Sequence, residues 1–176
     1  MDDLEKIHVE LGLTSELINL QKLPFIESCP LSDLVVAEID KEGRPFILHK
    51  DAARAWRQMK QAALSSSIEL TPQSGFRSLI YQKKLFENKL RQGYSIADVL
   101  KVVAAPGFSE HHSGRAIDFT KVSSNGSMTL DELFESTSDY QWLQENAANF
   151  GFFLSYPRNN IYGLAFEPWH WCYQGP

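Results

Sequence analysis

Hydrophobic residues recur at steps of three and four between residues 51 and 64, and this spacing places them on one face of a helix. The residues on that face are Ala52, Ala55, Trp56, Met59 and Ala63. A second helix is expected from about 78 to 92, because Gly93 suits a helix terminus. Ser95 resembles the N-cap of a third helix that runs through Val103, and residues 139–149 predict a fourth.

Short runs rich in β-branched and aromatic residues predict the strands. They cover residues 35–39, 45–48, 68–71, 116–119, 151–155 and 169–173. Helices cluster early and strands late, without regular alternation, which favours the α+β class: a single domain with a small antiparallel sheet flanked by helices. Residues 1–30 are mixed in character, and we interpret them as an N-terminal extension packed on the domain formed by residues 31–176.

Composition narrows the class of protein. The chain has 176 residues, of which 43% are hydrophobic, so it can build one sizeable core. Its formal net charge is -5, and no basic run interleaved with aromatics occurs. Phosphate binding needs clustered Lys and Arg, so a nucleic-acid partner is not expected. No apolar run approaches the roughly 20 residues of a transmembrane helix, and the sequence does not indicate an oligomeric state.

Cysteine usage and the first residues bear on the compartment. Cys29 and Cys172 are the two cysteines, and this count favours free or buried thiols over a disulfide framework. Residues 1–4 lack the charged-then-apolar pattern of a signal peptide. The expectation is therefore either a cytoplasmic protein or one whose export segment is not in this sequence, which would place it in the bacterial periplasm or cell envelope.

Three residues form a candidate metal site. A catalytic zinc uses three protein ligands drawn from His, Asp and Glu and leaves one position for water, and His111, Asp118 and His170 supply such a set. Each residue alone has an ordinary interpretation: a solvated histidine loop, a capping aspartate, or a half-buried aromatic strand around Trp169-His170-Trp171. Two histidines and a carboxylate also serve iron oxygenases, but those usually carry His-x-Asp, whereas His111 and Asp118 are seven positions apart.

The order and spacing of these residues resemble a known family. Ser-x-His-x-x-Gly-x-Ala-x-Asp at 109–118, followed by Glu-x-Trp-His at 167–170, resembles the VanY-type D-alanyl-D-alanine carboxypeptidases, members of the LAS group of zinc peptidases. Ser-Gly-Phe-Arg-Ser at 74–78 with Gln82 is similar to a further motif of that family, and so are the segments 48–53 and 153–157. The resemblance covers roughly residues 45–175 and implies the LAS/Hedgehog-like zinc peptidase fold.

Position by position, the resemblance implies a role for each matched residue. His111, Asp118 and His170 would bind one Zn2+ per chain, and Glu167 would act as the catalytic base. Arg77 would contact the substrate, where its planar fork of donors suits a carboxylate or a developing oxyanion. Gln82 and Ser109 would form hydrogen bonds in the substrate pocket. His112 falls on a variable position of the motif, so we expect it beside the ligands or facing solvent.

Two details near the last ligand need an explanation. Glu167 and His170 are three residues apart, which in a regular strand points them to opposite faces, so we infer a bend at Pro168. Family members often continue with Tyr-Arg-Tyr, whereas this chain has Trp171-Cys172-Tyr173. Residues 170 and 172 share a strand face, so we expect Cys172 near the metal without binding it.

The implied function is hydrolysis of the C-terminal D-alanine peptide bond in peptidoglycan stem peptides or muropeptides. The residues do not distinguish D,D- from L,D-carboxypeptidase activity or from a peptidoglycan endopeptidase. A second hypothesis is a non-catalytic zinc-bearing binding or signalling module, as in the related Hedgehog domain. The carboxylate of Glu167 favours the enzyme.

Overall fold

A computed structural model gives the fold of residues 2–40, 42–122, 128–129 and 132–175. The elements in chain order are α1 (Asp3–Leu11), α2 (Ser15–Ile18), η1 (Leu31–Asp33), β1 (Leu34–Ile39), β2 (Pro45–His49), α3 (Lys50–Ser65), β3 (Thr71–Ser74), α4 (Leu79–Arg91), α5 (Ile96–Val99), η2 (Glu110–Ser113), β4 (Ala116–Val122), β5 (Met128–Thr129), η3 (Glu132–Ser136), α6 (Ser138–Asn146), η4 (Ala147–Phe150), β6 (Phe152–Leu154) and β7 (His170–Tyr173). The predicted α+β class is confirmed.

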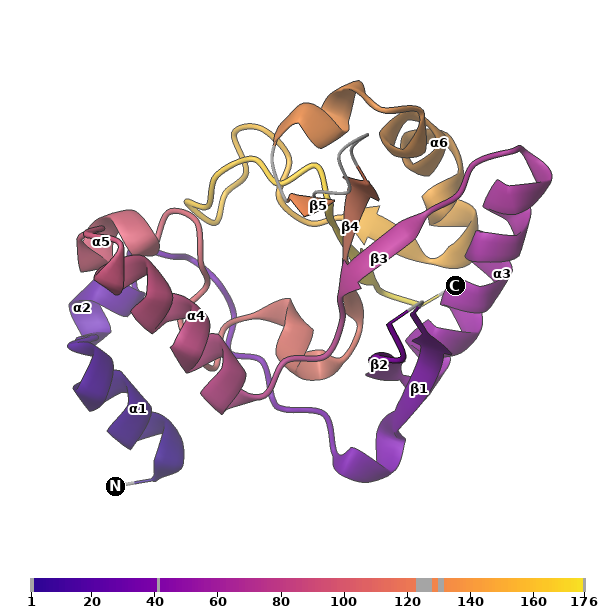
Figure 1. Ribbon diagram of the computed structural model, residues 1–176. Helices are drawn as coiled ribbons and strands as arrows, with labels where there is room; N and C mark the ends of the chain where they lie inside the picture. Colours follow the sequence, from indigo (N-terminus) through magenta and orange to yellow (C-terminus); the bar gives the residue numbers. More distant parts are fainter. Residues whose placement is uncertain (1, 41, 123–127, 130–131, 176) are drawn as a thin grey trace.

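The central sheet is antiparallel and has the strand order β3-β4-β7-β6, with β5 pairing on β4. Figure 1 shows α1, α2, α4 and α5 grouped on one side of this sheet and α3 and α6 on the other. Strands β1 and β2 form a separate antiparallel pair. The strand register brings the candidate site residues together, because Asp118 of β4 lies opposite both His170 of β7 and Ser74 of β3.

Helix α3 follows directly from its hydrophobic spacing. Its predicted apolar face is buried, and Trp56 and Met59 are completely inaccessible to solvent. His49 caps the helix, because its side chain accepts a hydrogen bond from the backbone N–H of Asp51. The buried face packs with Phe119 of β4 and Trp171 of β7 in the largest hydrophobic cluster, so α3 supports the two strands that carry Asp118 and His170.

Several predicted elements need correction. The strand expected over 68–71 begins only at Thr71, where that prediction ended, and continues to Ser74 as the edge strand β3. Pro72 is tolerated there because an edge strand does not need every N–H in its ladder. Ser95 caps α5 as predicted, but the helix ends at Val99, not at Val103. Residues 147–150 form a 3-10 helix instead of continuing α6.

The N-terminal residues form two helices that the sequence interpretation did not resolve. Asp2 and Glu5 make a reciprocal capping box at the start of α1, and Ile7 and Leu11 pack against Phe86 of α4. The chain then runs along η2 and the loop that precedes it. The backbone N–H of Ile26 donates to Gly107 O and that of Cys29 to His112 O, both at 2.8 Å. The boundary at residue 30 stays a prediction.

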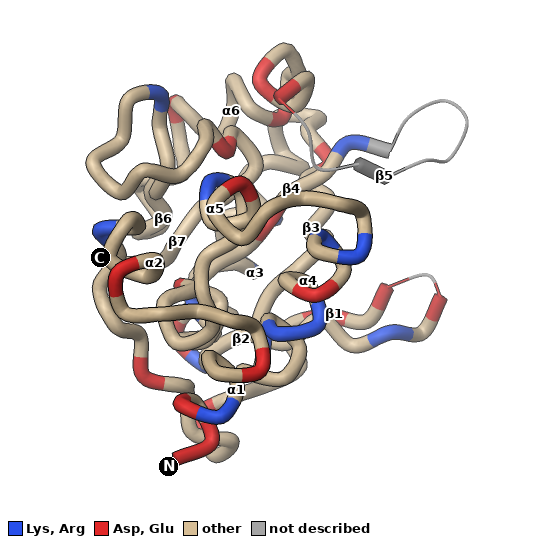
Figure 2. The backbone as a smooth tube through the Cα atoms, turned by 90° about the vertical axis from the view of Figure 1, so that its left-hand side faces the viewer, with Lys and Arg blue, Asp and Glu red and all other residues tan. Residues whose placement is uncertain are grey.

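The charge distribution agrees with the composition. On the face that Figure 2 shows, Lys and Arg lie among Asp and Glu and do not gather into a basic patch. Within the described residues, no helix is both long and apolar enough to cross a membrane. Both Cys29 and Cys172 are free thiols.

Candidate metal centre

The three predicted ligands come from three elements that meet at one point. His111 lies in the 3-10 helix η2, which ends at Gly114 in the left-handed region with φ +68°. A side chain at Gly114 would place its Cβ 2.8 Å from His49 N, so only glycine allows this turn beside β2. The turn leads into β4, where Asp118 faces His170 of β7 across the ladder.

The geometry of these three side chains suits a metal ion. His111 Nε2 lies 3.1 Å from Asp118 Oδ2, and His170 Nδ1 lies 2.9 Å from Asp118 Oδ1. Ligand atoms around a tetrahedral zinc lie about 3.3 Å apart, given bond lengths of about 2.0 Å. All three residues are at most 3% exposed, and one ligand atom from each lies within 4.8 Å of the others.

The ring nitrogen of His111 that points away from Asp118 already has a hydrogen-bond partner. His111 Nδ1 lies 2.6 Å from the carbonyl oxygen of Gly75, which accepts its proton and leaves Nε2 facing the cluster. This Nε2 is a buried polar atom without a hydrogen-bond partner among the described residues. A buried acceptor of this kind is costly unless it is paired, and a bound cation would pair it. The residues present therefore fit a zinc ion.

The protonation of the cluster follows from its burial and its charges. Burial lowers the pKa of His111 to about 4, with a further contribution from Arg77, so His111 is a neutral donor at pH 7. Burial alone would raise the pKa of Asp118, but the positive charge of Arg77 and the hydrogen bond from His170 outweigh it and hold that pKa well below its usual range. Neutral imidazole and ionised carboxylate are the forms that bind a metal. Burial lowers the pKa of His170, but its hydrogen bonds to Asp118 and Glu110 outweigh burial and raise that pKa to about 10, so a metal that binds there displaces a proton from this ring.

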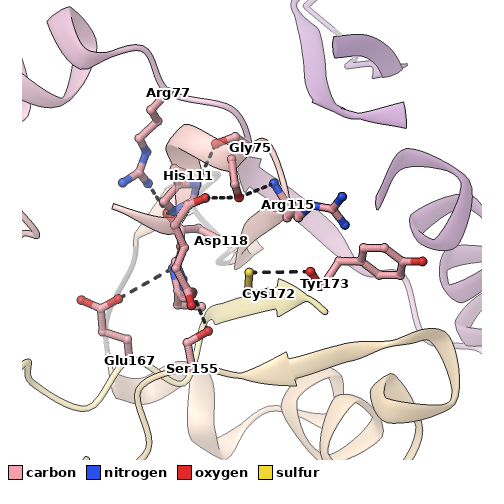
Figure 3. A network of polar contacts seen from close by, with 12 residues as sticks. Gly75, Arg77, His111, Arg115, Asp118, Ser155, Glu167, Cys172 and Tyr173 are labelled. Carbon is pink, nitrogen blue, oxygen red and sulfur yellow. Dashed lines mark hydrogen bonds and ion pairs between the residues drawn. The ribbon is translucent and has the colours of Figure 1, made fainter. Parts of the chain in front are cut away.

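Two further predicted residues flank the cluster. Arg77 donates from Nε to Ser74 Oγ at 2.8 Å and forms an ion pair through Nη2 with Asp118. Glu167 Oε2 lies 3.9 Å from His170 Nδ1. In the close view of Figure 3, Arg77 lies above Asp118 and Glu167 below it. Burial raises the pKa of Glu167 to about 7, which suits a group that exchanges protons near neutral pH.

The inferred bend before His170 is present. Residues 168 and 169 form a turn, the backbone N–H of His170 donates to Glu167 O at 3.1 Å, and β7 begins only at His170. Proline is favoured at the second position of such a turn. Glu167 therefore lies outside the strand, and its side chain reaches the same site as His170 although the two are three residues apart.

The two residues predicted to form hydrogen bonds in the substrate pocket, Gln82 and Ser109, are both buried. Gln82 is 1% exposed, and its Nε2 donates to Ala104 O at 2.9 Å, while its Oε1 is buried without a partner among the described residues. Ser109 is 3% exposed and precedes η2. Their substrate contacts stay a prediction.

The neighbour of the first ligand is buried. His112 is fully inaccessible, with Nδ1 2.7 Å from Arg77 O, and its Nε2 accepts from the backbone N–H of Gly107 at 3.1 Å. The sequence allowed two positions for His112, beside the ligands or facing solvent, and the second is wrong. It holds the loop that carries His111 against the backbone of Arg77.

The sequence interpretation missed two residues that contact His170. The ring of Tyr156 packs 4.8 Å from the imidazole ring of His170. The carboxylate of Glu110 lies 2.8 Å from His170 Nε2. The contact of Glu110 has no signal in the local sequence, because 60 residues separate it from His170. Tyr156 lies in the segment 153–157 that resembles the family, but that resemblance did not indicate its contact with His170. Cys172 is buried, and its Sγ lies 4.0 Å from Tyr173 O.

Comparison with known proteins places this chain in a family. Residues 46–176 match the profile of the VanY family, described as D-alanyl-D-alanine carboxypeptidase. The chain belongs to the VanY family. Over 158 residues it is 30% identical to VanXYC of Enterococcus gallinarum, a bifunctional D-Ala-D-Ala dipeptidase and carboxypeptidase, covering 88% of this chain and 76% of that protein.

Other relatives extend the likeness. YodJ of Bacillus subtilis (strain 168) is 39% identical over 82% of this chain, which spans only 54% of YodJ. The solved structure of the LD-carboxypeptidase LdcB superposes with a TM-score of 0.72 at 32% identity, covering 92% of this chain and 79% of LdcB. A VanY D,D-pentapeptidase solved in complex with Zn(II) superposes with a TM-score of 0.64 at 25% identity, covering 86% of this chain and 87% of that protein.

Proposed function

We propose that this protein is a zinc-dependent carboxypeptidase that hydrolyses the C-terminal D-alanine peptide bond of peptidoglycan stem peptides. The observation that carries the proposal is the buried His111, Asp118 and His170 cluster with Glu167 3.9 Å from one ligand. Membership of the VanY family supports the reaction, and the Zn(II)-bound relative supports the metal. The proposed substrate is a tetrapeptide or pentapeptide stem, cut by L,D- or D,D-hydrolysis respectively.

His111, Asp118 and His170 would hold the zinc ion. Zinc bound at such a site lowers the pKa of a coordinated water to about 7 and polarises a carbonyl oxygen. Glu167 would take a proton from the water as its oxygen attacks the carbonyl carbon, and would then give that proton to the leaving amine nitrogen. The pKa of Glu167, about 7, allows it to act in both directions.

Arg77 would meet the negative charge of the substrate. Its guanidinium is 14% exposed and is fixed by Ser74 and Asp118, so its position is set before a ligand arrives. A fixed, charged donor beside the reacting carbonyl stabilises a developing oxyanion, and the same group can anchor a terminal carboxylate.

The test is amino-acid release measured by mass spectrometry. Zinc-loaded protein and Glu167→Ala are incubated with tetrapeptide and pentapeptide stems. D-alanine released only by the unsubstituted protein is the expected result, and the preferred stem assigns L,D- or D,D-cleavage. If neither stem is cut, cross-linked wall fragments are offered next. Their cleavage would replace the proposal with an endopeptidase, and their persistence would favour a non-catalytic zinc module.

A further inference from the structure

His170 has a carboxylate on each of its ring nitrogens. Asp118 Oδ1 lies 2.9 Å from Nδ1, the nitrogen that faces the metal cluster, and Glu110 Oε2 lies 2.8 Å from Nε2 on the opposite edge of the ring. The nitrogen that binds a metal must be free of a proton. A hydrogen bond at the other nitrogen decides which nitrogen that is.

The carboxylate of Glu110 is held in place independently of His170. Ser155 Oγ donates to the same Oε2 atom at 2.6 Å, and Ser113 Oγ donates to the backbone carbonyl of Glu110 at 2.5 Å. Figure 3 shows Ser155 reaching this network from the end of β6. Among the ion pairs of the described residues, Glu110 is paired with His170 and with no Lys or Arg. Its charge is therefore directed at the imidazole.

The surroundings of Glu110 separate it from the reacting groups. Its side chain is 25% exposed and lines a cavity of about 430 Å3 together with Leu154, Ser155 and Tyr162. Neither Arg77 nor Glu167 lines this cavity. The contact of Glu110 with the cluster is its ion pair with the imidazole ring of His170.

We propose that Glu110, held by Ser155, is a positioning residue that accepts the Nε2–H of His170 and so directs Nδ1 at the zinc. His111 shows the same arrangement with a different acceptor, because its Nδ1 donates to the neutral carbonyl of Gly75. Loss of such an outer acceptor typically weakens metal affinity about 10- to 100-fold. This inference rests on the proposed zinc site and adds a residue to it.

The test is zinc affinity, measured by competition with a chromophoric chelator on the full chain. Glu110→Ala is expected to bind zinc about 10- to 100-fold more weakly than the unsubstituted protein. Glu110→Gln, which keeps an acceptor but no charge, is expected to fall between the two, and Ser155→Ala is expected to show a smaller loss. Glu145→Ala on the exposed face of α6 removes one carboxylate elsewhere and should leave the affinity unchanged.

Two further measurements separate positioning from catalysis and from folding. At saturating zinc, Glu110→Ala should recover most of its turnover, whereas Glu167→Ala should bind zinc normally and remain inactive. In the zinc-loaded protein, long-range 1H–15N spectra should place a proton on Nε2 of His170. Should Glu110→Ala not fold, Glu110→Gln decides in its place.

If Glu110→Ala binds zinc as tightly as Glu145→Ala does, the inference is overturned and the zinc peptidase is left intact. If Glu110→Ala does not fold, the same comparison is made with Glu110→Gln. A proton on Nδ1 would overturn the inference as well. If the unsubstituted protein binds no zinc, the proposed function and this inference fail together.

Discussion

The burial of Glu167 has a cost that can be measured as pH-dependent stability. Its pKa rises from 4.5 to about 7 on folding because the side chain is desolvated. Between these values the folded protein binds more protons than the unfolded chain, so its stability falls as pH increases and levels off above pH 7. At 1.36 kcal/mol per pKa unit, the loss from this residue between pH 5 and pH 8 is about 2.5 kcal/mol.

Glu167→Gln removes this titration and keeps the shape of the side chain. The free energy of unfolding in urea, measured on zinc-stripped protein, should therefore favour the variant over the unsubstituted protein by about 2.5 kcal/mol more at pH 8 than at pH 5. Other groups titrate in both proteins, so their contributions largely cancel. The exposed Glu145→Gln is the matched control and should show no such gap. A difference between Glu167→Gln and the unsubstituted protein that stays constant with pH would refute the reasoning.

Three other substitutions test the framework of the site. Asp118→Asn should abolish the binding of one zinc per chain, measured by elemental mass spectrometry, because it removes the only anionic ligand of the cluster. Gly75→Ala should lower the free energy of unfolding by about 1–3 kcal/mol, because its Cβ would lie 2.4 Å from Ile47 O; an unchanged urea midpoint would contradict this. Gln21→Ala should lower the free energy of unfolding by about 2 kcal/mol or more, because it removes the hydrogen bonds that this side chain makes with Leu100 O, Val103 O and Ala105 N. Thermal unfolding measures the loss, and Gln141→Ala on the exposed face of α6 is the control.

Local patterns in the sequence were sufficient where the structure is local. The apolar face of α3, the extent of α4 and the N-cap of α5 were predicted because these signals lie within a few residues of one another. The capping box of Asp2 and Glu5 was also readable and would have located α1. The end of α5 was not predicted, because Gln21, about 80 residues away in the chain, binds the carbonyls that follow it.

The residues of the candidate site also fall into those with a signal in the sequence and those without one. The motif spacing named the three proposed ligands, which do cluster, and Glu167, which lies beside them, and the bend at Pro168 followed from the properties of proline. The partners of the imidazole rings were not predicted. Gly75 and Glu110 reach His111 and His170 only through tertiary contacts, and a glycine carbonyl or a single glutamate carries no distinguishing pattern.

The turn that joins Glu167 to His170 also limits how the site can move. One backbone hydrogen bond closes it, and His170 is then fixed in the β7 ladder opposite Asp118. The proposed base and a proposed metal ligand therefore form one mechanical unit. The backbone separation of these two groups is set within four consecutive residues, so a substitution elsewhere changes it only by breaking this turn or the β7 ladder.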